Sequence, residues 1–246
     1  MRNDLIEDCA KRFRQANGLD QDSPINPYTL LLGLNIVTLF RNLDENFSGM
    51  CLKNGDNRFI LVNSSHSLGR QHFTIGHEIY HLFFQEDFKP HACSPGTGKT
   101  PEEKDADLFS SILLMPEYGI RRMIPKHELL KRNISTGTVL KLEQYFGVSH
   151  NAMLNRLHQL KLTSDSNDRE LRETTGIRRL AASLGFDTSL YGSGNQNKTI
   201  GDYGIIARRL FEEGHISEGH YYELIGKIGI TETSGEDHET KDTIGL

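Results

Sequence analysis

The sequence predicts an α+β fold with a small antiparallel sheet in its N-terminal part and helices after it. Three short segments are expected to form the strands of this sheet: residues 35–40, 47–53 and 58–63. Asn54-Gly55 lies between the last two segments and is a strong signal for a tight hairpin. Two longer segments without an internal proline have the apolar spacing of amphipathic helices: residues 71–84 and 102–115.

Further helices are expected before and after this part of the chain. Residues 3–16 carry a one-sided apolar stripe, and Asn26-Pro27 looks like a cap followed by proline at the first helical position. Later helical segments are expected over residues 119–161, 169–184 and 203–228. Residues 163–169 have the composition of a polar linker between two such segments.

This pattern predicts two domains. The first covers residues 1–162 and includes a helical segment over residues 119–162. The second, residues 163–246, is a helical C-terminal extension whose polar and acidic tail, after Thr231, is expected to be disordered.

Composition narrows the class of protein. The chain has 246 residues, a formal charge of −5 and three cysteines. So mild a charge implies no dominant nucleic-acid or membrane-surface partner. The cysteines, Cys9, Cys51 and Cys93, are widely separated, so neither a disulfide framework nor a Cys-x-x-Cys zinc knuckle is expected. No apolar run approaches the ~20 residues of a membrane span, and acidic residues interrupt the N-terminus where a secretory signal needs an apolar core. We expect a cytoplasmic protein.

A metal-binding pattern stands inside the helix predicted over residues 71–84: His77-Glu78-Ile79-Tyr80-His81. Helix positions four apart differ by about 40° around the axis, so His77 and His81 project from one face. Two imidazoles in this arrangement can bind one zinc ion at about 2.0–2.1 Å. Glu78 then reaches a water on the metal, which makes it the candidate general base of a peptidase. The alternative is that His77 and His81 are ordinary surface or core histidines. That alternative does not explain why two imidazoles share one face of the same helix.

The next predicted helix offers a third ligand. Glu103 and Asp107 are spaced i, i+4 and lie on one face of that helix. Because a catalytic zinc needs three protein ligands and an open position for water, we assign Glu103 as the third ligand. We assign Asp107 as the acceptor that orients a ligating imidazole. The alternative is that residues 102–105 merely form a first turn favourable to the helix dipole.

At these residues the sequence resembles the ImmA/IrrE family of bacterial metallopeptidases. Seven stretches carry the resemblance: Arg70–Leu82, Glu103–Ser110, Leu113–Pro116, Phe146–Ser149, Asn155–Leu157, Leu190-Tyr191 and Ile216-Ser217. The resemblance implies a zincin-like α+β domain with one Zn²⁺ per chain, held by His77, His81 and Glu103, and with Glu78 as the base. Family members are associated with cleaving repressors or regulators in stress, mobile-element and phage circuits. The implied partner is therefore a regulatory protein, cut as a substrate.

One position departs from the family pattern, because Tyr80 stands where many members have glycine. Its ring could narrow the cleft or donate a hydrogen bond. A peptidase also needs a donor for the oxyanion that forms at the attacked carbonyl. Tyr80, His91 and Tyr118 are the candidates, and the sequence does not choose among them.

A second class of function rests on the basic segment 121–161, which has eight Lys/Arg against two Asp/Glu. Ser135 to Phe146, the turn at Gly147-Val148, and Ser149 to Leu160 together resemble a helix-turn-helix. Packing is the favoured interpretation, because six apolar residues look like core: Leu140, Leu142, Phe146, Met153, Leu154 and Leu157. The alternative is a DNA-binding or antirepressor protein with a structural or vestigial zinc site, and a toxin or antitoxin component is a third. Glu78 separates the classes, since a purely structural site does not need it.

Overall fold

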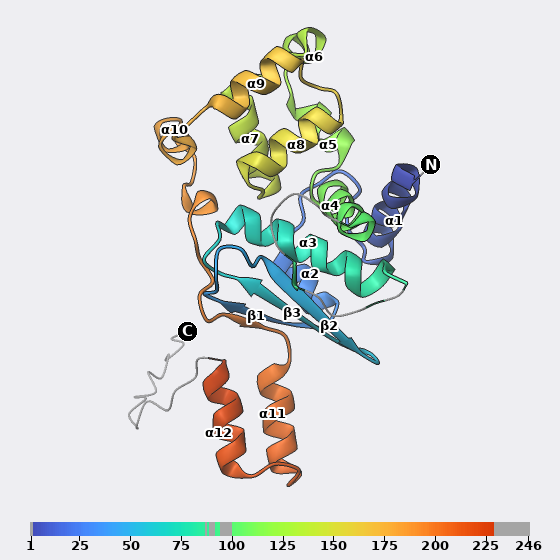
Figure 1. The fold of residues 1–246 in the computed structure, drawn as a ribbon, viewed down its shortest axis with the longest axis vertical. Helices are drawn as coiled ribbons and strands as arrows, with labels where there is room; N and C mark the ends of the chain where they lie inside the picture. Colours follow the sequence, from blue (N-terminus) through green and yellow to red (C-terminus); the bar gives the residue numbers. More distant parts are fainter. Residues whose placement is uncertain (1, 87, 89–91, 94–99, 229–246) are drawn as a thin grey trace, which may run out of the picture. The chain divides into compact units, whose positions relative to one another are not determined.

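The computed structural model describes residues 2–86, 88, 92–93 and 100–228 and divides the chain into two compact units, Met1–Tyr203 and Gly204–Leu246. The first unit has the α+β fold that the sequence predicts (Figure 1). Its sheet has the strand order β4-β2-β3-β1-β5. The strands are β1 (Ile36–Arg41), β2 (Gly49–Asn54), β3 (Asn57–Asn63), β4 (Ala92–Cys93) and β5 (Thr199–Ile200).

The sheet is mixed, which corrects the prediction of an antiparallel sheet. β2 and β3 form the predicted antiparallel hairpin, with Gly55 and Asp56 as its two central residues and Gly55 at a φ of 59°. β1, however, pairs with the other edge of β3 and runs parallel to it. The connection over residues 42–48 carries the chain past β3 to reach β2, and the buried Asn63 amide donates to the carbonyls of Leu43, Asp44 and Phe47 in that connection. This long-range contact has no signal in the strand pattern.

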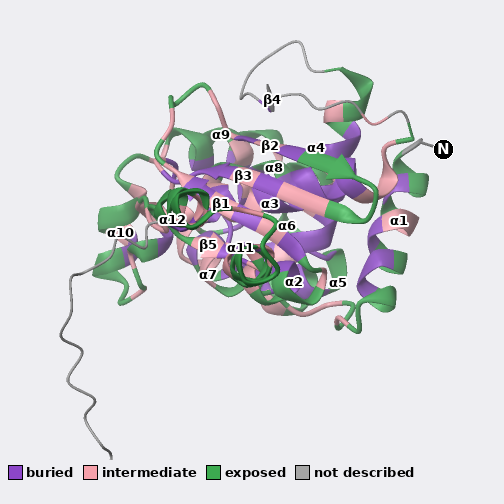
Figure 2. Cartoon of the chain, turned by 90° about the horizontal axis from the view of Figure 1, so that it is seen from below, coloured by how far each residue is buried: buried purple, intermediate pink, exposed green. Residues whose placement is uncertain are grey.

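Four helices pack with the sheet: α1 (Arg2–Ala16), α2 (Pro27–Gly33), α3 (Leu68–Phe84) and α4 (Pro101–Leu114). α3 lies across the sheet, α4 packs against α3 on the side away from the sheet, and α1 packs against α4 (Figure 1). The Asn26 side chain accepts from the amides of Tyr28 and Thr29 at the start of α2, and Thr100 caps α4 in the same way. The apolar core between sheet and helices is buried along β1, β3 and α3 (Figure 2).

A second helical layer follows α4 in the same unit. Its elements are α5 (Glu117–Met123), α6 (Lys126–Lys131), α7 (Thr136–Phe146), α8 (His150–Gln159), α9 (Asp165–Glu173), α10 (Ile177–Ser183) and the 3-10 helix η1 (Ser189–Tyr191). The six apolar residues expected to pack between the two predicted helices of the basic segment are all at most 2% exposed, so the packing interpretation is confirmed. Most of the predicted linker, residues 163–169, is helical instead, because α9 begins at Asp165 and the Ser164 side chain caps it.

The first unit continues past residue 162, where the sequence predicted a domain boundary. β5 pairs with β1 through Thr38↔Ile200 and Leu39↔Thr199. The Asn195 side chain also donates to Tyr28 Oη (2.8 Å) and Gln71 Oε1 (3.0 Å). These contacts join residues 192–200 to the sheet and to α3.

The second unit contains α11 (Tyr203–Glu212) and α12 (Glu218–Lys227). Ser217 caps α12, and the rings of Phe211 and Tyr221 stack with centroids 5.1 Å apart. Both helices are largely exposed (Figure 2). The predicted disordered tail after Thr231 lies outside the described residues.

Replacing Gly69 with alanine is expected to destabilise the first unit by ~1–3 kcal/mol, because the added Cβ would overpack a rigid contact. Gly69 is the second residue of α3, and a Cβ there would lie 2.5 Å from Ser149 N and 2.6 Å from Val148 C, which are backbone atoms. Gly137 is the second residue of α7 and has nothing within 4 Å of a built Cβ, so it is the matched control. Gly137→Ala should stabilise by up to ~1 kcal/mol. Urea unfolding monitored by circular dichroism measures both, and equal stability of the two variants would contradict this expectation.

Candidate metal centre

α3 carries the two histidines of the predicted motif on one buried face. His77 is 5% exposed and His81 is fully buried. Their Nε2 atoms lie 3.1 Å apart, one helical turn from each other. Both imidazoles can be buried here because polar side chains surround them: Gln85, Glu103 and Asp107.

α4 brings Glu103 to the same point. The Glu103 carboxylate has Oε2 at 3.3 Å from His77 Nε2 and Oε1 at 3.3 Å from His81 Nε2. The close approach of the two helices requires Gly76, since a Cβ there would lie 2.5 Å from Ser110 Oγ, which itself donates to the Phe73 carbonyl. The structure thus brings together all three residues that the sequence assigned as ligands.

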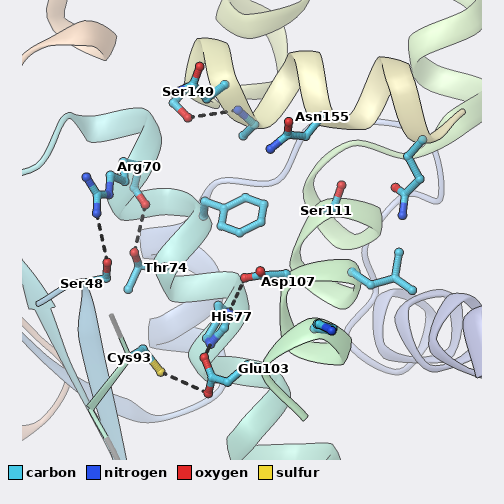
Figure 3. Close-up of a pocket in the computed structure, with 16 residues that line it drawn as sticks. Ser48, Arg70, Thr74, His77, Cys93, Glu103, Asp107, Ser111, Ser149 and Asn155 are labelled. Carbon is cyan, nitrogen blue, oxygen red and sulfur yellow. Dashed lines mark hydrogen bonds and ion pairs between the residues drawn. The ribbon is translucent and has the colours of Figure 1, made fainter. Parts of the chain in front are cut away.

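The other nitrogen of each imidazole is held by an acceptor. His77 Nδ1 lies 2.9 Å from Asp107 Oδ1, as expected for the residue assigned to orient an imidazole (Figure 3). His81 Nδ1 lies 2.7 Å from Gln85 Oε1, a contact that sequence reasoning missed. Burial lowers the pKa of His77, but the carboxylates of Asp107 and Glu103 outweigh burial and raise that pKa to about 9. Both contacts direct the Nε2 atoms towards Glu103.

Glu78 is fully buried, and neither of its carboxylate oxygens has a hydrogen-bond partner among the described residues. A buried carboxylate without partners is costly unless a cation or a water compensates it. The β2 backbone passes close beside it, because a Cβ on Gly49 would lie 3.1 Å from Glu78 Oε1. The thiols of Cys51 and Cys93 are its neighbours. Burial raises the pKa of both thiols, and the charge of Glu78 raises it further.

Cys93 joins the metal-binding group, although sequence reasoning gave it no role. One donor atom from each of His77, His81, Cys93 and Glu103 lies within 4.8 Å of all the others. Cys93 Sγ is 3.9 Å from Glu103 Oε1 (Figure 3). The strand pattern of the sequence offered no signal for this, because Cys93 is placed by the pairing of β4, a strand of two residues, with β2.

Two of the three candidate oxyanion donors lie in the described part of the chain, and of these the Tyr80 ring meets the His81 ring edge to face, with centroids 5.7 Å apart. Tyr80 points into the aromatic core, where its ring stacks on Phe84 and tilts against Phe109. Tyr118 is 65% exposed on α5 and lines a different cavity with Arg14 and Glu117. His91 lies outside the described residues.

A cleft of about 560 Å³ opens beside the metal-binding group (Figure 3). α3 and α4 form two of its walls, with His77 and Glu103 at the inner end. The third wall is α8, which contributes polar residues together with Ser149 before it: Ser149, Asn151, Asn155 and Gln159. The cleft is therefore lined by groups that can hydrogen-bond an extended polypeptide.

The same helix bears on the DNA-binding alternative. Its one arginine, Arg156, is 5% exposed, and its guanidinium donates to the Met115 carbonyl at 3.0 Å and to Gln159 at 2.7 Å. The amide side chains of α8, those of Asn151, Asn155 and Gln159, line the cleft. The second helix of the helix-turn-helix pair thus offers its polar side to the candidate centre.

The donor set fits a tetrahedral metal ion. Two nitrogen or oxygen donors at about 2.0–2.1 Å from such an ion lie about 3.3–3.4 Å apart. The three observed spacings among His77, His81 and Glu103 are 3.1, 3.3 and 3.3 Å. The unpartnered Glu78 carboxylate stands next to this set. Imidazole and carboxylate donors, a nearby buried carboxylate and an open cleft are typical of metal centres in hydrolytic enzymes.

The fold and this centre are those of a metallopeptidase-type α+β domain. A family model for the IrrE N-terminal-like domain, a peptidase family, matches residues 33–158, and the chain belongs to that family. The match runs from the end of α2 to α8 and contains all the residues of the centre. No curated protein matches the chain. Among the described residues, no helix has the length and apolar character needed to cross a bilayer.

Proposed function

We propose that this protein is a zinc-dependent endopeptidase that hydrolyses a peptide bond in a regulatory protein. One observation carries the proposal: three donors with tetrahedral spacing lie beside a buried carboxylate that has no hydrogen-bond partner among the described residues. A structural metal site would have no use for such a carboxylate. The peptidase family to which the chain belongs supports the same conclusion.

In this proposal His77, His81 and Glu103 hold the zinc ion, and Asp107 and Gln85 fix the two imidazoles in the orientation that presents Nε2. The bound ion supplies Lewis acidity, which acidifies a water and polarises a peptide carbonyl. Glu78 accepts the proton of that water on a carboxylate oxygen and passes it to the nitrogen of the leaving amine. Its burial keeps this oxygen free of bulk water and close to the reacting groups.

The cleft favours an extended peptide over a small molecule. It is lined by residues of α3, α4 and α8 together with Ser48 and Cys93, and its walls carry hydroxyl and amide side chains suited to peptide groups. The choice of a repressor or other regulator as substrate follows the resemblance to the ImmA/IrrE family. The three cysteines carry thiols rather than disulfides, in keeping with the cytoplasm as the compartment that we propose.

A peptide-library digestion tests the function. The zinc-loaded protein is incubated with peptides derived from a bacterial proteome, and new N-termini are mapped by mass spectrometry. We expect new termini that a chelator abolishes and added zinc restores. A protein that binds one zinc per chain yet produces no new termini, from the library or from the product of a neighbouring regulator gene, would contradict the peptidase proposal and favour the antirepressor alternative.

Replacing Asp107 with alanine is expected to lower zinc affinity by about 10–100-fold, since His77 loses the acceptor that orients its ring. The Asp107→Asn variant should lose less zinc affinity than the alanine variant, because its amide oxygen can still accept a hydrogen bond from His77 Nδ1. Competition with a chromogenic chelator measures both affinities. Equal affinity of the alanine variant and the wild type would remove Asp107 from this role.

A further inference from the structure

Cys93 is held at the metal centre by the backbone of β4. Cys93 pairs with Gly49 and Ala92 with Met50 in antiparallel register, and Ser48 N donates to the Cys93 carbonyl at 2.8 Å. Gly49 is the point at which β2 passes Glu78. The pairing therefore sets Cys93, which is 5% exposed, opposite the β2 residue that passes Glu78, with its Sγ 3.9 Å from Glu103 Oε1.

The position of the thiol fits a fourth ligand. A zinc–thiolate bond is about 2.3 Å long, so a tetrahedral site would hold sulfur about 3.5–3.6 Å from an oxygen or nitrogen ligand. Cys93 Sγ is 3.9 Å from Glu103 Oε1, which is within a few tenths of an ångström of that spacing. A small shift of the side chain completes the set.

A fourth protein ligand has a consequence for Glu78. A catalytic site keeps one position for water, whereas a site with four protein ligands is closed. Glu78 is buried, and its Oε1 lies beside Gly49, the β2 residue that pairs with Cys93. The thiol thus stands on the side of the centre where the base would meet a water.

We propose that Cys93 is a fourth, displaceable ligand of the metal, so that this arrangement of the chain is a latent form of the peptidase. This inference rests on the proposed function, because it assigns a state of the same centre. β4 occupies the edge of β2 at Gly49 and Met50. An extended peptide substrate that pairs with this edge takes the place of β4 and removes the thiolate with it, so the wild type still cleaves such peptides, at a reduced rate.

Cobalt substitution tests the assignment without using activity. Co²⁺ replaces zinc in tetrahedral sites, and a thiolate ligand gives it a charge-transfer absorption in the near ultraviolet. We expect one Co²⁺ per chain and this absorption in the wild type, and its complete loss in Cys93→Ala with the visible bands of bound cobalt retained. Cys9→Ala, at a partly buried position on α1, is the matched control and should keep the absorption.

The outcomes separate this inference from the proposed function. One bound cobalt without a thiolate band in the wild type, or a band that persists in Cys93→Ala, overturns the role of Cys93 and leaves the peptidase proposal standing. Absence of cobalt binding overturns both.

Alkylation gives a second readout that needs no variant to fold. Iodoacetamide labelling of Cys93, followed by mass spectrometry with Cys9 as internal reference, should slow when zinc is added and recover with a chelator.

A third readout compares activities. Cleavage by zinc-loaded Cys93→Ala should exceed that of the wild type. Labelling that zinc leaves unchanged, or cleavage that the variant does not increase, contradicts the latent form.

Discussion

Replacing Glu78 with glutamine is expected to abolish peptide cleavage while leaving one zinc ion per chain. The glutamine side chain is nearly isosteric, so it fits the buried position beside Gly49, but it cannot accept a proton. Loss of a general base lowers the rate by about 10²–10⁴-fold. The measurement combines metal analysis of the purified variant with its initial rate on a substrate peptide.

Glu86→Gln is the matched control for this result. Glu86 is exposed just after the end of α3, so its replacement changes the net charge equally without touching the centre. We expect wild-type cleavage from it. Undiminished cleavage by Glu78→Gln would remove Glu78 as the base, and loss of zinc from that variant would instead make it part of the ligand set.

Replacing Glu103 with alanine is expected to abolish stable zinc binding at the centre. Two histidines remain, with a gap where a carboxylate bridges both Nε2 atoms at 3.3 Å. The loss of zinc affinity should exceed about 100-fold, the upper cost of removing a residue that only supports a ligand. Zinc content after dialysis, measured by mass spectrometry of the metal, gives the result.

Its control is the preceding residue. Glu102 lies in the same first turn of α4 but is exposed, so Glu102→Ala removes the same charge from the same helix end. This variant should keep one zinc per chain. If both variants retain the metal, Glu103 is only a favourable first-turn residue, which is the plainer interpretation of the sequence.

Local periodicity accounts for what could be predicted of the site. Residues four apart on one helix must share a face, so spacing alone pairs His77 with His81 on α3 and Glu103 with Asp107 on α4. The α3–α4 packing then brings the two pairs together, through the contact of Gly76 with Ser110.

The features that escaped prediction depend on contacts between distant segments. The parallel pairing of β1 with β3 follows from a crossover fixed by Asn63, and the strand pattern alone cannot distinguish it from a meander. Cys93 reaches the centre through a two-residue strand, which is too short to leave a periodic signal. The burial of Tyr80 among aromatic rings likewise depends on which side of α3 meets α4.

The helix-turn-helix segment shows how a structural context changes the meaning of a motif. Its two helices, the turn between them and its apolar core agree with the sequence prediction. The polar residues that looked suited to DNA face the cleft instead, and Arg156 is buried against the Met115 carbonyl. The segment is thus one wall of the candidate peptide site.

The most direct test of the metal centre is a crystal structure of the zinc-loaded protein with data collected on both sides of the zinc absorption edge. We expect one anomalous difference peak per chain, within bonding distance of His77 Nε2, His81 Nε2 and the Glu103 carboxylate. A peak at another set of residues, or no peak from protein that received stoichiometric zinc, would contradict the account.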